Sequence, residues 1–236
     1  MEPTIYKPSI YKGAGIFKAG AEGGGGGGSW GVNCGKEFII ASSSLSAPII
    51  CTNDYMQVKS TPGQTIGDGQ RFGVSPNYGN DITWDNLEIG TEIELNEIAN
   101  ISRYGSGRTQ LFSRCGLFNP QYTDTYKFEI NNYDGKGWFY IFGNLRGEQF
   151  SFSYNTDIVI NFLMKKTDID KVNFKCTYEN DIKFNSELQI PEKRMTDTCL
   201  PAFGGIGQNI GFIYNSKLLK GSYIRINREI LFGEPL

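Results

Sequence analysis

Hydrophobic and polar residues alternate along much of this chain with a period of two. Residues 91–95 read Thr-Glu-Ile-Glu-Leu, which puts Ile93 and Leu95 on one face and Glu92 and Glu94 on the other. Such alternation is typical of a β-strand with one buried face. Strands are therefore expected here and in other short runs that alternate or are hydrophobic throughout: 36–40, 47–51, 109–114, 126–130, 138–142, 149–154, 157–164, 171–178, 211–214 and 221–230.

The spacing of these runs predicts the fold class. They recur at intervals of roughly 8–12 residues, with turn-forming links and no long amphipathic helix pattern, as in β-sandwiches and barrels. The link at residues 178–184 indicates a tight hairpin about Asn180-Asp181. A length of 236 residues suits a single all-β domain.

The first 30 residues differ from the rest in composition. Of the 30 glycines in the chain, 11 lie in the first 35 positions, and residues 23–28 are an unbroken glycine run. A run of this length is a flexible coil with a root-mean-square reach of about 13 Å. We therefore expect an arm with a polyglycine joint over residues 1–30 and a β-domain over residues 31–236.

The arm carries a triplet of isoleucine, an aromatic residue and lysine, repeated three times at spacings of five and six residues. Pro3, Pro8 and Gly13 oppose a helix there, which favours an extended peptide. Such a peptide cannot bury its own apolar side chains, so one interpretation is an arm that docks on a partner surface or between identical chains. The other interpretation is a disordered tail. The docking interpretation assigns anchoring to Ile5, Tyr6, Ile10, Tyr11, Ile16 and Phe17.

The overall composition narrows the classes of partner. With 23 basic and 25 acidic residues the net charge is −2, which gives no electrostatic basis for binding nucleic acid or an anionic membrane. No apolar run is long enough to span a bilayer, and the N-terminus lacks the apolar stretch of a secretory signal. Five widely and irregularly spaced cysteines are expected to be small buried hydrophobic residues: Cys34, Cys51, Cys115, Cys176 and Cys199.

The chain contains no histidine. This excludes the serine–histidine and cysteine–histidine nucleophile schemes and the ordinary histidine base. The glycine run lacks the lysine and the strand–helix context of a phosphate-binding loop. Asp68 and Asp81 lie in loops that are suited to Ca²⁺, but without the spacing of a calcium loop they are interpreted as turn residues. We therefore expect no enzymatic activity, no cofactor and no metal.

One stretch nevertheless has a catalytic pattern. Residues 92–97 read Glu-Ile-Glu-Leu-Asn-Glu, and some glycoside hydrolases use two outer carboxylates on one strand as nucleophile and acid, about 5 Å apart. Glu92 and Glu97 would match that pair if a bulge changed the phase of the strand, although the central residue is Glu94 instead of an aspartate. The alternative is a row of solvent-facing glutamates over a buried hydrophobic row.

A second stretch suits a sugar. Aromatic rings stack on sugar faces, and asparagine or aspartate side chains bind hydroxyls, so the candidate glycan-binding residues are Trp138, Tyr133, Asp134 and Asn132. The alternative is that the segment 138–142, Trp-Phe-Tyr-Ile-Phe, belongs to the core, because both of its faces are apolar.

The order of segments in the β-region resembles a known architecture. A glycine-rich turn precedes residues 109–114, paired runs and a hairpin follow, and the phrase Phe203-Gly204-Gly205 comes before the last strands. This order is similar to that of concanavalin A-like and laminin G-like domains. The resemblance covers roughly residues 31–236 and implies a two-sheet antiparallel jelly-roll sandwich.

The arm resembles a different group of proteins. Its Ile-Tyr-Lys repeats followed by polyglycine look like virion proteins of crAss-like gut bacteriophages. That resemblance implies a head-fibre or decoration subunit of the virion, assembled in the host cytoplasm. Its partners would be capsid or other virion proteins and further copies of itself, with a trimer favoured. The alternative function is a carbohydrate-binding module that attaches to host or mucus glycans.

Overall fold

In a computed structural model of the protein, the backbone is described for part of the chain. The described ranges are 38–40, 49–51, 54–59, 71–76, 83–101, 110–118, 126–131, 135–142, 144–196, 200–206, 215–233 and 235–236. The predicted arm and its polyglycine joint lie outside these residues, and so does the boundary expected near residue 30.

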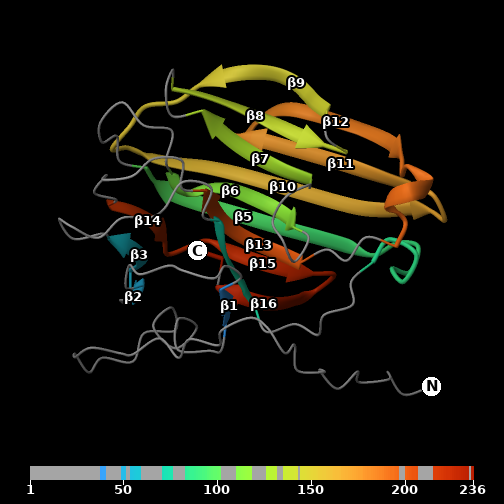
Figure 1. Ribbon diagram of the computed structural model, residues 1–236, viewed down its shortest axis with the longest axis horizontal. Helices are drawn as coiled ribbons and strands as arrows, with labels where there is room; N and C mark the ends of the chain where they lie inside the picture. Colours follow the sequence, from blue (N-terminus) through green and yellow to red (C-terminus); the bar gives the residue numbers. More distant parts are fainter. Residues whose placement is uncertain are drawn as a thin grey trace.

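Two antiparallel sheets make up the described part of the chain (Figure 1). The first has seven strands in the order β1 (Phe38–Ile40), β4 (Arg71–Pro76), β13 (Leu200–Ile206), β6 (Gln110–Phe118), β7 (Tyr126–Asn131), β8 (Lys136–Ile141) and β9 (Asn144–Ser151). The second has nine strands: β12 (Asp181–Gln189), β11 (Lys171–Tyr178), β10 (Asp157–Asp168), β5 (Glu92–Asn100), β14 (Asn215–Leu219), β3 (Tyr55–Lys59) and β2 (Ile49–Cys51), with β15 (Tyr223–Ile226) and β16 (Glu229–Gly233) beside them.

Strand β5 lies at the centre of the nine-stranded sheet. One of its edges pairs with β10 along the whole strand, and the other edge pairs first with β15 and then with β14. The gap between these two partners is closed by Ser222, which is fully buried. Its hydroxyl accepts a hydrogen bond from the Ile98 amide at 2.8 Å and donates one to the Ile98 carbonyl at 3.2 Å. A side chain therefore replaces one step of the backbone ladder.

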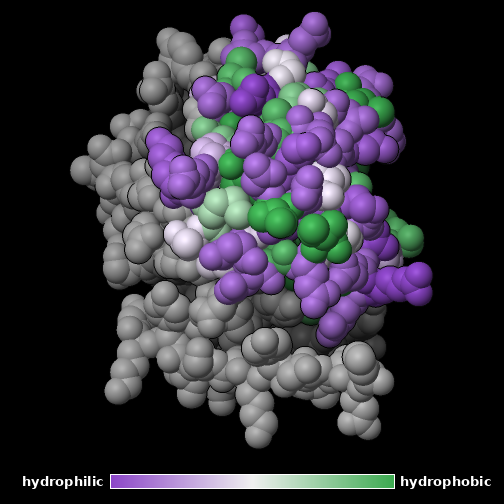
Figure 2. Space-filling model, turned by 90° about the vertical axis from the view of Figure 1, so that its right-hand side faces the viewer, coloured by the Kyte–Doolittle hydropathy of each residue, from purple (hydrophilic) through white to green (hydrophobic). Residues whose placement is uncertain are grey.

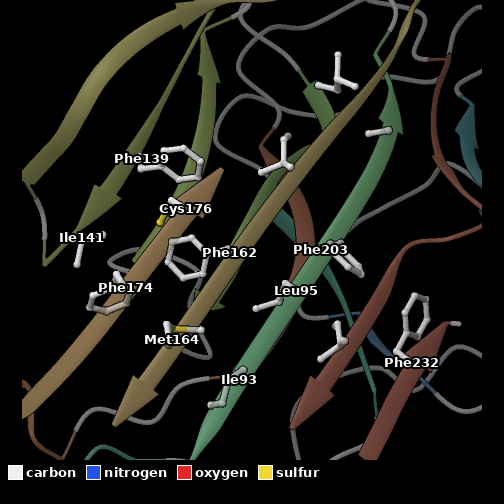
Figure 3. Packing of buried hydrophobic residues seen from close by; sticks show 14 of the residues in the cluster. Ile93, Leu95, Phe139, Ile141, Phe162, Met164, Phe174, Cys176, Phe203 and Phe232 are labelled. Carbon is white, nitrogen blue, oxygen red and sulfur yellow. The ribbon is translucent and has the colours of Figure 1, made fainter. Parts of the chain in front are cut away.

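The core lies between the two sheets and follows from the alternation in the sequence. Ile93, Leu95 and Phe162 point inward from neighbouring strands of the nine-stranded sheet, while Phe139 points inward from β8 (Figure 3). The Phe139 and Phe162 ring centroids are 6.3 Å apart, and those of Phe162 and Phe174 are 5.8 Å apart. Aromatic pairs at this separation add stabilisation beyond the area that they bury.

The segment 83–91 closes one end of this core. The Trp84 ring packs edge-on against Phe174, with centroids 6.4 Å apart, and is almost fully buried. Lys166, on the inner face of β10, donates a hydrogen bond from Nζ to the Trp84 carbonyl. Because Lys166 is buried, its pKa is lowered from the ordinary lysine value, and the nearby Asp85 carboxylate opposes that shift.

The outer strands β9 and β12 of the two sheets meet at one side of the sandwich (Figure 1). Gly147 of β9 lies against the Lys183 carbonyl oxygen, so closely that a Cβ atom would collide with it. The Gly147 φ of 70° is also a left-handed value that favours glycine. This glycine therefore permits the close approach of the two strands.

The predicted all-β, two-sheet antiparallel sandwich is confirmed. Strands form in ten of the predicted runs, with shifts at the ends, and Cys176 is a buried free thiol as expected. Helix is restricted, within the described ranges, to the single turn η1 (Glu192–Arg194), and none of it is long or apolar enough to cross a membrane.

The sequence prediction was wrong in some details. Strands β3 and β4 were not predicted, and the phrase that contains Phe203 forms a strand, β13, in its own right. The 178–184 hairpin turns at Glu179-Asn180, where both φ angles are positive, one residue earlier than expected. The run 221–230 divides into β15 and β16, and the run 211–214 lies outside the described residues.

Candidate functional site

The outer face of the nine-stranded sheet carries a set of polar side chains on adjacent strands. Residues opposite each other in paired strands point to the same side of a sheet. The register places three rows across β15, β5, β10, β11 and β12, which we call the polar face: Arg225, Glu94, Leu163, Lys175 and Asn185; Tyr223, Asn96, Asn161, Thr177 and Ile182; and Glu92, Lys165, Asn173 and Glu187.

Asparagine recurs across this face. Asn96, Asn161, Asn173 and Asn185 stand on four neighbouring strands, β5, β10, β11 and β12, and each points outward. Asparagine is depleted in β-strands because it packs poorly on a pleated surface and competes for backbone hydrogen bonds. Its amide both donates and accepts hydrogen bonds. Four such residues on neighbouring strands therefore suit a surface that binds hydroxyl groups.

Glu94 is the centre of a hydrogen-bonded cluster on this face. Its Oε1 accepts hydrogen bonds from Asn161 Nδ2 at 2.8 Å and from the Tyr223 hydroxyl at 2.9 Å. Its Oε2 forms an ion pair with the guanidinium of Arg225. The Glu94 side chain is 12% exposed and that of Arg225 is 41% exposed. The cluster thus places a carboxylate beneath a guanidinium that is accessible to solvent.

Tyr223 is held as a neutral phenol. Burial, the hydrogen bond to Glu94 and the charge of that carboxylate raise the pKa of Tyr223 to about 12, against a lowering effect of Arg225. The Arg225 guanidinium also lies 5.9 Å from the centre of the Tyr223 ring. The phenol is therefore a hydrogen-bond donor at all ordinary pH values.

Two further contacts hold side chains in place beside this cluster. Lys165 Nζ lies 2.8 Å from Glu92 Oε1 in an ion pair whose two side chains are about half exposed. Asn96 Nδ2 donates to the Gly221 carbonyl at 3.1 Å, which ties it to the turn between β14 and β15. Hydrogen bonds of this kind fix side-chain orientation before a ligand arrives.

The carboxylate pair predicted from Glu92 and Glu97 does not form. The pairing of β5 with β10 is continuous from Glu92 to Asn100, without the bulge that the pair requires. Glu92 therefore lies on the outer face, while Glu97 points into the core and is fully buried. The alternative, a row of outward glutamates over Ile93 and Leu95, is right for Glu92 and Glu94 and wrong for Glu97.

Trp138 lies on the other outer surface of the sandwich. In β8, Phe139 and Ile141 belong to the core, while Trp138 and Tyr140 point away from it and are half-buried. The Trp138 and Tyr140 rings are edge to face, with centroids 6.1 Å apart. The core interpretation of this run is therefore right for alternate residues only, and glycan binding by Trp138 stays a prediction.

Several predicted site residues lie outside the part of the chain that the structure describes. They are the other candidate glycan-binding residues, the two loop aspartates and the anchoring residues of the arm: Asn132, Tyr133, Asp134, Asp68, Asp81, Ile5, Tyr6, Ile10, Tyr11, Ile16 and Phe17. Among the residues that are described, no three histidine, cysteine, aspartate or glutamate side chains gather as metal ligands would.

The polar face was missed in the sequence, although a signal for it exists. Three of the strand-like runs carry an asparagine directly between an inward hydrophobic residue and the next inward position: Ile160-Asn161-Phe162, Val172-Asn173-Phe174 and Phe184-Asn185-Ser186. The contacts of Glu94 with Tyr223 and Arg225 carry no such signal, because β5 and β15 are more than 120 residues apart in the chain.

No protein-family model matches the sequence, and no curated protein does. Solved structures with a similar fold include lectin I-B4 from Griffonia simplicifolia in its metal-free form, at 8% identity, with 80% of this chain and 92% of that chain covered and a TM-score of 0.48. An alginate lyase matches at 9% identity over 83% of this chain and 88% of that chain, with a TM-score of 0.48. The catalytic domain of a glycoside hydrolase family 131 protein from Coprinopsis cinerea matches at 13% identity over 76% and 73%, with a TM-score of 0.44.

These proteins are similar to the chain in fold alone. Identities of this size assign no ligand or activity.

Proposed function

We propose that the described β-sandwich is a non-enzymatic, lectin-like domain that binds carbohydrate through its polar face. The observation that carries this proposal is the placement of four outward asparagines on neighbouring strands beside the hydrogen-bonded cluster of Glu94. Sugar hydroxyls donate and accept hydrogen bonds, and amides and carboxylates positioned by their own neighbours match them at a low cost in side-chain entropy.

The shape of the face also suits an extended saccharide. Five strands at a spacing of about 4.8 Å give rows about 19 Å long, which accommodates several sugar units lying across the strands. Leu163 stands in the central row between Glu94 and Lys175 and offers an apolar contact to the C–H face of a ring. Both outward glutamates of β5 form an ion pair with a cationic side chain, an arrangement that suits carbohydrate binding.

Screening of the full chain against a polysaccharide and glycan panel tests the proposal. The Glu94→Gln variant keeps the shape of the side chain but removes the charge that orients Arg225, and it should lose most of the binding. Glu148→Gln is the matched control, since Glu148 is exposed on β9 of the other sheet. Equal binding by the wild type and both variants, with folding verified by thermal melting, would contradict a role for the polar face.

The proposal places this domain on a virion appendage. Support comes from the sequence alone: the repeated Ile-aromatic-Lys triplets and the glycine run over residues 1–30 suit an arm that anchors to capsid or other virion proteins. The sandwich of residues 31–236 would then be displayed as part of a homo-oligomer, with a trimer favoured. Host or mucus glycans would be its targets.

Deletion of residues 1–20 tests the anchoring role separately. The truncated chain should keep its carbohydrate binding and lose assembly, measured by light scattering and by incorporation into particles. A monomeric full-length chain that enters particles with or without the arm would exclude anchoring by the arm.

A further inference from the structure

The side of the sandwich where β9 meets β12 carries Arg146, which has no counter-ion among the residues that the structure describes. Arg146 is half-buried, and its Nε atom is shielded from solvent with no hydrogen-bond acceptor. No ion pair or hydrogen bond of its guanidinium is found within the described ranges. A shielded donor of a charged group without an acceptor costs free energy, and a guanidinium binds carboxylate or sulfate oxygens in a two-bond fork.

A second cation stands on the neighbouring strand β12. Arg146 is paired with the inward-pointing Phe139, so it points toward the inner side of the sheet at its edge. The next residue, Gly147, lies against the Lys183 carbonyl, which makes β9 and β12 immediate neighbours here. The Lys183 side chain is 23% exposed, and its Nζ is 6.0 Å from the centre of the Phe150 ring.

The acid that accompanies Lys183 does not balance these two charges. Asp181 Oδ2 is 3.5 Å from Lys183 Nζ, and the Asp181 side chain is 79% exposed, so the ion pair contributes little. Beside the cations, the rings of Phe150 and Tyr178 stack with centroids 4.1 Å apart. The edge thus combines two incompletely neutralised cations with an aromatic wall.

We propose that Arg146 and Lys183 bind the negatively charged oxygen group of an acidic saccharide, a carboxylate or a sulfate. This inference rests on the carbohydrate-binding function proposed above and names the class of ligand. The rows of the polar face end at β12, and Lys183 follows directly on Ile182, the last residue of the row that contains Asn96 and Asn161. A saccharide that lies across the strands therefore reaches this edge.

Binding of charged and neutral saccharides to the full chain tests this assignment. The probes are glucuronic acid, inorganic sulfate, and matched acidic and neutral oligosaccharides, titrated while the Arg146 Nε–Hε resonance is followed by NMR. Acidic oligosaccharides should bind the wild type roughly tenfold or more tightly than neutral ones. Arg146→Met and Lys183→Met should remove that preference, while Arg146→Lys should keep part of it.

The control is Arg228→Met, because Arg228 is an exposed arginine in the turn between β15 and β16. Equal affinity for acidic and neutral saccharides, or a preference that survives in Arg146→Met, would overturn the inference and leave the proposed function intact. If no oligosaccharide binds, the proposed function fails. In that case a shift of the Arg146 resonance with glucuronic acid or sulfate supports an anion site, and an unmoved resonance overturns it.

Discussion

The two faces of the nine-stranded sheet obey the same alternation and differ in what their side chains do. On the inner face, residues such as Leu95, Phe162 and Phe174 are excluded from solvent and pack against the other sheet. On the outer face, the interleaved positions carry asparagines, Glu94 and a network of directed hydrogen bonds. Hydrophobic burial stabilises the fold, so an inner residue is replaceable by another of similar volume.

This difference between the two faces indicates that the outer face is the one to examine for a functional site. Asparagine is disfavoured in strands relative to threonine, so β-sheet propensity does not account for the outward asparagines. Their recurrence on four strands therefore calls for a reason other than folding. The part of the surface that is coloured in Figure 2 is mainly hydrophilic, with separate hydrophobic groups of which the most prominent lies near its middle.

The largest expected effect is a loss of stability, and it distinguishes the inner face of the nine-stranded sheet from the outer face. Phe162→Ala removes a fully buried ring and should lower the free energy of unfolding by about 3–5 kcal/mol in a urea titration. Leu163→Ala, at the next position on the outer face, should cost less than about 1 kcal/mol. Similar losses for the two variants would break the distinction between the faces.

The next effect concerns the edge where the sheets meet. Gly147→Ala puts a Cβ against the Lys183 carbonyl at a positive φ, so we expect a loss of more than about 2 kcal/mol in unfolding free energy. Gly90 is the control: its φ is 94°, but nothing lies near the added methyl group. Gly90→Ala should therefore cost only about 1 kcal/mol. A small loss in both variants would mean that the edge relaxes freely.

Lys166, a buried cation on the inner face, should make the stability of the fold depend on pH. The folded protein lowers the pKa of Lys166, so this lysine loses its proton in the folded state at a pH where the unfolded chain keeps it. The unfolded state then binds more protons, and stability rises with pH as the solution approaches the ordinary lysine pKa. Relative to Lys166→Met, the wild type should become more stable over that range in thermal melts. A constant difference would show that Lys166 does not titrate in this way.

On the outer face, Tyr223 should give a pH dependence of stability with the opposite sign. The pKa of Tyr223 is raised to about 12, so the folded state keeps a proton that the unfolded chain loses near the ordinary tyrosine value of 10. The stabilisation is complete below pH 10 and is lost as the pH rises toward 12. Against Tyr223→Phe, the wild type should lose stability in this range. Titration of the phenol absorbance in the folded protein provides an independent value of the Tyr223 pKa.

The smallest expected change in stability belongs to the asparagines. Asn173→Thr should alter the free energy of unfolding by no more than about 0.5 kcal/mol, with a gain as the expected direction, because threonine is favoured in strands. The same variant should weaken polysaccharide binding, measured by retention in an affinity gel. Unchanged retention would assign the outward asparagines no role in binding.

The fold was accessible from the sequence to a greater extent than the site. Alternation predicted the inner residues Ile93 and Leu95 of β5, because a half-buried strand repeats every two residues. The same alternation implies burial of Glu97, and the expectation of an exposed glutamate was wrong because it rested on the charge of the side chain. The cluster of Glu94, Tyr223 and Arg225 depends on the pairing of β5 with β15, which no local pattern encodes.

The most direct test of the central claim is an NMR titration of the full chain, labelled at its asparagine side-chain amides and tryptophan indoles, with a polysaccharide that it retains. We expect shifts of the Asn96, Asn161, Asn173 and Asn185 amides at ligand concentrations that leave the Trp138 indole unchanged. Shifts confined to the Trp138 indole, with all four amides unmoved, would contradict binding at the polar face and place the binding surface on the other sheet.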